Sequence, residues 1–194
     1  MSRPVAVAIT GGIGAGKSEA LQAFKRHGAA TVSSDEIVHH LLRQPAVRDR
    51  VVARMGNGIL APDGEIDRGA LATVVFNDRD ALGFLEELLH PLVAAEYIRW
   101  RDALAELPDA PTVCVTEVPL LYETGGDARF DKVVVITAPA KLRRARSIVA
   151  TEDREARLIP DAEKIKRADY SFRNMGSLEE LDDFVASVMH SLVS

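Results

Sequence analysis

Two hydrophobic patterns alternate along most of the chain. Short apolar runs rich in β-branched residues are typical of strands buried on both faces, and apolar residues at helical spacing separate most of them. The runs lie at Val5–Thr10, Ala30–Ser33, Thr112–Thr116, Lys132–Thr137 and Tyr170–Arg173. Because strands that alternate with helices usually pair in parallel, the pattern predicts an α/β fold with helices on both faces of a parallel sheet.

The stretch between Leu41 and Pro111 departs from this alternation. Its apolar residues recur at helical spacing, as at Leu82, Leu85 and Leu89, and a turn-rich segment, GNGILAPDGEID, interrupts them. We therefore expect a mainly helical insertion within a single domain.

Composition and charge limit the classes of function. With 47% hydrophobic and 27% charged residues, the 194-residue chain is typical of a soluble globular protein. Its formal net charge of −5 argues against a general nucleic-acid binder, whose affinity rests on a basic surface. No apolar run approaches the roughly 20 residues that span a bilayer, and no signal-peptide pattern is found, so we expect a cytoplasmic protein without a membrane partner. The single cysteine, Cys114, lies in a predicted strand and is expected to be inert.

A glycine-rich motif follows the first predicted strand. Gly11, Gly16, Lys17 and Ser18 satisfy the pattern G-x-x-x-x-G-K-[ST] between a strand and an amphipathic helix. Glycine lets the backbone curl until its N–H groups point at phosphates, and the helix N-terminus adds positive potential. The lysine is expected to reach the β- and γ-phosphates of ATP, and the serine to bind Mg²⁺ that arrives with the nucleotide. The predicted nucleotide contacts are Gly12, Ile13, Gly14, Ala15, Gly16, Lys17, Ser18 and Glu19.

The motif alone does not separate a kinase from a GTPase or an ATP-driven switch, but further segments narrow the choice. TGGIGAGKS, HPLV at 90–93, PLLYETGGD at 119–127 and ADYSFRNMG at 168–176 resemble the dephospho-CoA kinase family, and DGEIDRGALATVVF at 63–76 is similar to another family segment. The resemblance implies a P-loop NTPase fold of three α/β/α layers with a five-stranded parallel sheet, a helical substrate-binding region and a lid. The core would then occupy about 1–40, 110–145 and 166–194, the helical region 41–109 and the lid 146–165.

The activity that this resemblance implies is ATP-dependent phosphorylation of the 3′-hydroxyl of dephospho-CoA, the last step of coenzyme A synthesis. ATP and dephospho-CoA are thus the expected substrates. Two alternatives stay open: another nucleoside or nucleotide kinase, which would differ in the helical insertion, and a non-catalytic ATP-binding regulator.

Asp35 is the candidate base for the attacking hydroxyl. The family usually has Asp-x-Asp at this place, whereas this chain has Ser33 at the first position and Asp35 at the second. A carboxylate there is expected to bind the acceptor and take its proton. The structural alternative is a capping box of Ser33 and Glu36, with Asp35 merely favouring the helix N-terminus.

A second acidic residue, Glu117, follows a predicted strand at the place of a Walker B acid, which is often aspartate in the family. It is expected to orient water on Mg²⁺, although a solvated strand end is the alternative. Glu19 also departs from the family, which commonly has threonine there, so only its backbone N–H is expected to serve phosphate.

Positive charge gathers near the predicted lid. Ten of the 24 lysines and arginines lie between Lys141 and Arg173. Arginine suits phosphate binding because its planar guanidinium stays charged and grips two oxygens. Arg144 matches the family's arginine best and is expected to assist catalysis at the ATP phosphates, with Arg154 or Arg157 as a second clamp. Most of the other cations are expected to form a solvated face.

The remaining candidates take their roles from the resemblance alone. Asn174 and Gly176 match an Asn-x-Gly motif and are expected to border the adenine of ATP. Arg68, His90 and Glu123 lie in segments that the resemblance assigns to the acceptor, and Arg68 is expected to hold an acceptor phosphate. A lone histidine at a helix end is also compatible with a structural role.

Overall fold

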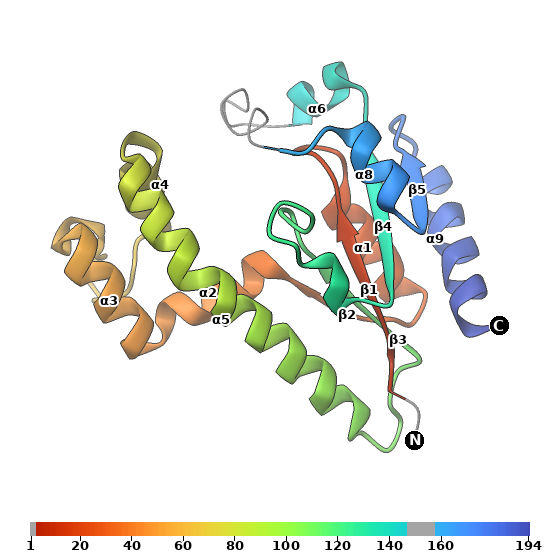
Figure 1. Ribbon diagram of the computed structural model, residues 1–194, viewed down its shortest axis with the longest axis horizontal. Coiled ribbons are helices and arrows are strands. Elements are labelled where there is room, and N and C mark those ends of the chain that lie inside the picture. Colours follow the sequence, from red (N-terminus) through yellow and green to blue (C-terminus); the bar gives the residue numbers. More distant parts are fainter. Residues whose placement is uncertain (1–2, 147–157) are drawn as a thin grey trace. The chain divides into compact units, whose positions relative to one another are not determined.

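Five parallel strands form one sheet in the computed structural model, which describes residues 3–146 and 158–194 (Figure 1). The strands are β1 (Val5–Thr10), β2 (Ala30–Ser33), β3 (Val113–Glu117), β4 (Lys132–Thr137) and β5 (Tyr170–Arg173). Their order in the sheet is β2-β3-β1-β4-β5, and every pair is parallel. Four strands have the predicted bounds. β3 lies one residue later than predicted because Val113, not Thr112, is the register partner of Val5.

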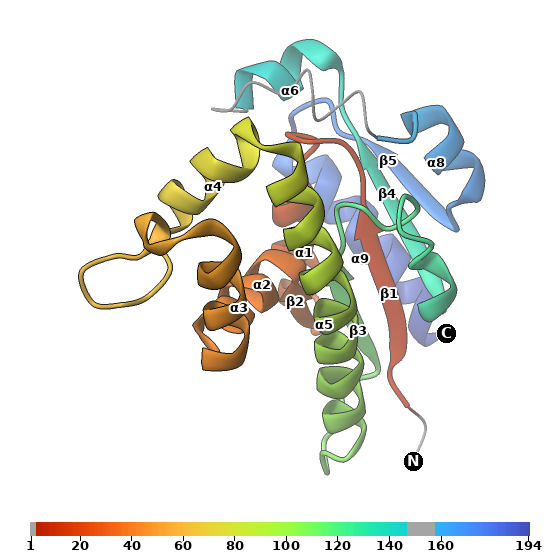
Figure 2. The ribbon, with the colours of Figure 1, turned by 60° about the vertical axis from the view of Figure 1, so that its left-hand side comes forward.

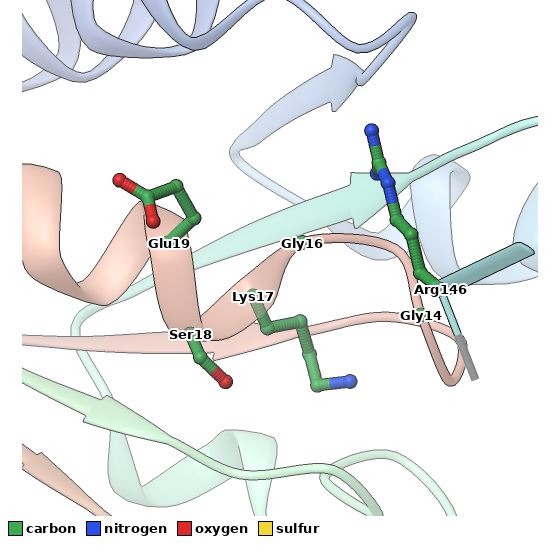
Figure 3. Close-up of a pocket in the computed structure, with 6 residues that line it drawn as sticks. All are labelled: Gly14, Gly16, Lys17, Ser18, Glu19 and Arg146. Carbon is green, nitrogen blue, oxygen red and sulfur yellow. The ribbon is translucent and has the colours of Figure 1, made fainter. Parts of the chain in front are cut away.

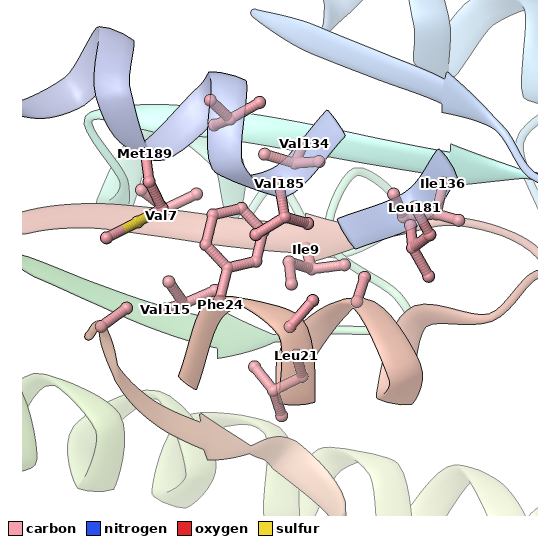
Figure 4. Close-up of a cluster of buried hydrophobic side chains, with 14 of the residues drawn as sticks. Val7, Ile9, Leu21, Phe24, Val115, Val134, Ile136, Leu181, Val185 and Met189 are labelled. Carbon is pink, nitrogen blue, oxygen red and sulfur yellow. The ribbon is translucent and has the colours of Figure 1, made fainter. Parts of the chain in front are cut away.

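Helices α1 (Lys17–Arg26) and α9 (Leu178–Val193) cover one face of this sheet. Phe24 of α1 is fully buried and lies among side chains of α9 and of the central strands, including Val185 and Ile9 (Figure 4). Ser177 is the N-cap of α9, since its hydroxyl accepts a hydrogen bond from the N–H of Glu180 at 3.2 Å. This face holds the larger of the described apolar clusters.

The opposite face of the sheet is covered by the segment after β3 and by the region of α8 (Asp161–Arg167). Leu121 and Tyr122 pack against strand residues such as Ala8 and Val135, with Ile159 at the edge. Helical or irregular chain thus lies on both faces, which confirms the three-layer α/β/α prediction. Cys114 is buried in β3, and burial raises the pKa of its thiol to about 11, so the thiol stays protonated at neutral pH.

The carboxyl ends of the strands meet at one edge of the sheet because all five are parallel. The P-loop follows β1, and Glu117 ends β3. Helix α6 (Ala140–Arg146) follows β4, and Asn174 follows β5. A short 3-10 helix, η2 (Asp127–Arg129), lies between β3 and β4. Segments far apart in sequence are therefore brought to the same edge.

Residues Ser34–Arg99 form a second compact unit, which is helical as predicted. It contains α2 (Ser34–Arg43), α3 (Pro45–Met55), η1 (Asn57–Ile59), α4 (Arg68–Asn77) and most of α5 (Arg79–Ala105) (Figure 2). The turn-rich segment is closed by a bridge between Leu60 and Ile66. Among residues 3–146 and 158–194, no helix has both the length and the apolar character needed to cross a bilayer.

Candidate active site

The loop between β1 and α1 forms a pocket of about 200 Å³ at the carboxyl edge of the sheet (Figure 3). Its lining residues are Gly14, Gly16, Lys17, Ser18, Glu19 and Arg146. Gly16 has φ of 101°, in the left-handed region that favours glycine, and a Cβ there would collide with the side-chain amide nitrogen of Asn174. The backbone of the motif thus requires glycine at this point, as the sequence predicts.

Lys17 and Ser18 point to the same side of the N-terminus of α1, whereas Glu19 points to the other (Figure 3). Lys17 Nζ donates a hydrogen bond to the carbonyl of Gly12 at 3.1 Å, and Ser18 Oγ donates one to Glu117 Oε2 at 3.2 Å. The structure therefore brings together the two residues that the sequence proposes for magnesium. A hydroxyl and a carboxylate are oxygen ligands of the kind that Mg²⁺ prefers, so this pair fits the ion.

Two arginines of α6 lie next to the P-loop, and neither is the one chosen from the sequence. The guanidinium of Arg143 lies against Gly12, and the backbone of Arg143 lies against Gly14. Arg146 lines the pocket. Arg144 is exposed and is not among the residues that line it.

The spacing of these arginines explains the difference. Residues three apart share one face of a helix, whereas the residue between them points elsewhere. The i, i+3 spacing of Arg143 and Arg146 is therefore the sequence pattern that places both on one face of α6. The resemblance to the family pointed to Arg144 instead. The role of Arg144 at the ATP phosphates stays a prediction, and Arg154 and Arg157 lie outside the described residues.

Asn174 connects the end of β5 to the P-loop. Its buried side chain donates a hydrogen bond from Nδ2 to the carbonyl of Ala15 at 3.0 Å, and its Oδ1 accepts one from the N–H of Gly176 at 2.9 Å. Both ends of the amide are thus used within the protein. The adenine contacts of Asn174 and Gly176 stay predictions, but the structure does place Asn174 beside the P-loop and Gly176 beside Asn174.

Glu123 lies in the segment after β3, and its side chain is only 12% exposed. Its Oε1 accepts a hydrogen bond from the N–H of Ile159 at 2.9 Å and pairs with Lys164 Nζ at 2.8 Å. No pattern in the sequence predicts this ion pair. The acceptor contact of Glu123 stays a prediction.

The other acceptor candidates belong to the unit Ser34–Arg99. Asp35 is the second residue of α2, is exposed, and makes no hydrogen bond or ion pair with another described residue. Arg68 is the exposed first residue of α4, after Asp67, whose carboxylate caps the helix by accepting from the N–H groups of Gly69 and Ala70. Within this unit, Asp35 and Arg68 are thus available to a ligand.

His90 is exposed in the interior of α5, so its expected place at a helix end is wrong. The helix continues through Pro91, whose ring removes one hydrogen bond without ending the helix. The role of His90 at the acceptor stays a prediction.

Known proteins resemble this chain over nearly its whole length. The family model described as dephospho-CoA kinase matches residues 5–180. A dephospho-CoA kinase of Symbiobacterium thermophilum is 38% identical over 181 residues, which cover 89% of this chain and 75% of the relative. One of Aquifex aeolicus is 36% identical over 96% of both chains.

Comparison with solved structures indicates the same family as the sequence relatives. The structure of a dephospho-CoA kinase from Campylobacter jejuni has a TM-score of 0.70 and 28% identity, and the match covers 96% of both chains. Three findings thus agree on the family: a family model matches most of the chain, the relatives are more than 30% identical, and the solved structure has the same fold. The chain belongs to the dephospho-CoA kinase family.

Proposed function

We propose that this protein transfers the γ-phosphoryl group of ATP to the 3′-hydroxyl of dephospho-CoA, giving coenzyme A and ADP in the last step of coenzyme A synthesis. The observation that carries the proposal is the pocket lined by Lys17 and Ser18, with Ser18 hydrogen-bonded to Glu117, in a chain of this family. The proposal includes a cytoplasmic location and no nucleic-acid partner. The net charge of −5 supports the second of these, because nucleic-acid binding rests on a basic surface.

The P-loop residues bind and orient the phosphate donor. The N–H groups at the start of α1 and the ammonium of Lys17 face the β- and γ-phosphates, and Arg146 adds a second positive charge. Ser18 and Glu117 would hold Mg²⁺, which neutralises charge on the phosphate oxygens when it is bound. Phosphoryl transfer depends mainly on such positioning and charge neutralisation.

The acceptor residues move one proton and hold one substrate. The 3′-oxygen of dephospho-CoA forms a bond to the γ-phosphorus as the bond from that phosphorus to the β-γ bridging oxygen breaks. Asp35 takes the hydroxyl proton, and ADP leaves. Arg68 and His90 bind the acceptor in this proposal, Arg68 through a phosphate.

An acceptor panel tests the function. With ATP and Mg²⁺, we expect ADP formation with dephospho-CoA and at least about a hundredfold lower kcat/KM with AMP, CMP or dCMP, because contacts to the pantetheine arm help orient the reacting hydroxyl. This ratio corresponds to roughly 2.7 kcal/mol of transition-state free energy. ADP release is measured for all four acceptors under one set of conditions. A nucleoside monophosphate that outperforms dephospho-CoA would overturn the assignment, and no stimulation by any acceptor would favour an ATP-binding regulator.

A pair of arginine variants tests which cation of α6 serves ATP. Arg146→Ala is expected to lower kcat/KM for ATP by roughly 10- to 100-fold, the range of a lost charged hydrogen bond. Arg144→Ala is the matched comparison on the same helix and is expected to change it by less than about threefold, because Arg144 does not line the pocket. The reverse order would restore Arg144 as the phosphate clamp.

A further inference from the structure

A buried ion pair joins α8 to the segment after β3. The side chain of Lys164 has no exposed surface, and its Nζ lies 2.8 Å from Oε1 of Glu123. Lysine is seldom fully buried because its charge must be desolvated, and a buried ion pair adds little net stability over apolar residues of similar volume. Stability alone therefore gives little reason for this pair.

Three further contacts join the same segments. Arg167 Nη2 lies 2.9 Å from Asp127 Oδ2, and the guanidinium stacks over the ring of Tyr122, 4.1 Å from its centroid. The N–H of Ile159, just before α8, also donates to Glu123 Oε1. Helix α8 is thus fixed to residues 122–127 by contacts at its start and at its end.

Each of the joined segments is connected along the chain to a residue beside the nucleotide pocket. Residues 118–127 begin immediately after Glu117, which accepts the hydrogen bond of Ser18. Helix α8 leads through β5 to Asn174, which holds the carbonyl of Ala15 in the P-loop. The ion pair therefore joins two stretches of chain that each contain or lead to a residue hydrogen-bonded to the phosphate-binding loop or to the start of α1.

We propose that Glu123 and Lys164 are positioning residues for the phosphate donor. By holding α8 against the segment after β3, the pair fixes where β5 ends and so where Asn174 meets the P-loop, without itself touching ATP. In this role Glu123 does not bind the acceptor: its Oε1 is engaged by Lys164 and Ile159, and its Oε2 is buried without a hydrogen-bond partner among the described residues. The inference rests on the proposed function only for the identity of the acceptor.

Glu123→Gln and Lys164→Met test this role, alone and combined. Each single variant is expected to weaken ATP binding roughly tenfold, because small displacements of binding groups far from the chemistry are costly. KM for dephospho-CoA is expected to stay within about twofold. The double variant is expected to be no worse than either single variant, since both substitutions remove the same interaction. ATP affinity is measured by calorimetry without acceptor, and both KM values by ADP release.

Lys166→Met is the matched control. Lys166 lies on the same helix, is 69% exposed and, among the described residues, pairs only with its neighbour Glu163, so its loss is expected to leave ATP affinity and melting temperature unchanged. If Lys164→Met does not fold, Glu123→Gln, which keeps the size of the side chain, decides alone.

Three results would overturn the proposal. A raised KM for dephospho-CoA in Glu123→Gln alone would make Glu123 an acceptor ligand. A lower melting temperature with unchanged ATP affinity would make the pair structural only, and additive effects in the double variant would show that the residues act separately. The first of these results depends on the acceptor. The other two come from ATP calorimetry and thermal unfolding without acceptor, so they remain decisive even if dephospho-CoA proves to be the wrong acceptor.

Discussion

Lys17→Ala is expected to lower kcat by about 10³-fold, near the upper end of what a single charge-stabilising group contributes in an enclosed site. Lys17 lines the phosphate pocket, and its Nζ is held 3.1 Å from the carbonyl of Gly12. Alanine keeps the N-terminus of α1 but removes the positive charge that stabilises the negative charge developing on the phosphate. Steady-state ADP release measures the loss, and circular dichroism confirms that the variant is folded.

Lys25→Ala is the control for this prediction. Lys25 is exposed in the last turn of the same helix, away from the pocket, so its removal is expected to leave kcat unchanged within about twofold. Near-normal activity in folded Lys17→Ala would refute the assignment of the P-loop as the donor site.

Asp35→Asn is expected to lower kcat by about 10³-fold, within the range for loss of a general base, with little change in ATP affinity. Asparagine has nearly the same shape but cannot take the hydroxyl proton. The Asp35 carboxylate is exposed and makes no hydrogen bond or ion pair with another described residue, so its replacement breaks no such interaction. Single-turnover measurements separate the chemical step from product release.

Glu36→Gln serves as the comparison because Glu36 is the other acid in the first turn of α2. If Asp35 acts only on the helix dipole, both variants are expected to lose about 0.5–1 kcal/mol of stability and to retain activity. Unfolding by urea measures that loss. Equal stability losses with wild-type kcat would assign Asp35 to the helix and not to catalysis.

Strand bounds follow from sequence where burial on both faces leaves a continuous apolar run. β1 and β4 are such runs, and their bounds are as predicted. The P-loop is equally predictable, because its glycines are required by the local backbone conformation of the loop. The sequence also predicts that Glu117 and Ser18 lie near one another, because parallel strands bring their carboxyl ends to one edge of the sheet.

Other features depend on distant contacts that leave no local pattern. Three arginines within four residues are equivalent in composition, and only the packing of α6 on the P-loop separates Arg146 from Arg144. The burial of Lys164 opposes the usual preference of lysine for water and becomes intelligible only with Glu123 beside it. The helical unit begins at Ser34, earlier than the predicted helical region at 41, because α2 packs with α3.

The strand order sets a sequence of events during synthesis. β1 is the middle strand of the sheet, yet both of its neighbours, β3 and β4, are translated after the whole of Ser34–Arg99. An apolar strand with two open edges must therefore wait on the ribosome while the helical unit is completed, and such strands are prone to pair with other chains. The phosphate-binding loop acquires the strands on both sides of β1 only after β4 has been translated, so ATP cannot assist the earlier stages of folding.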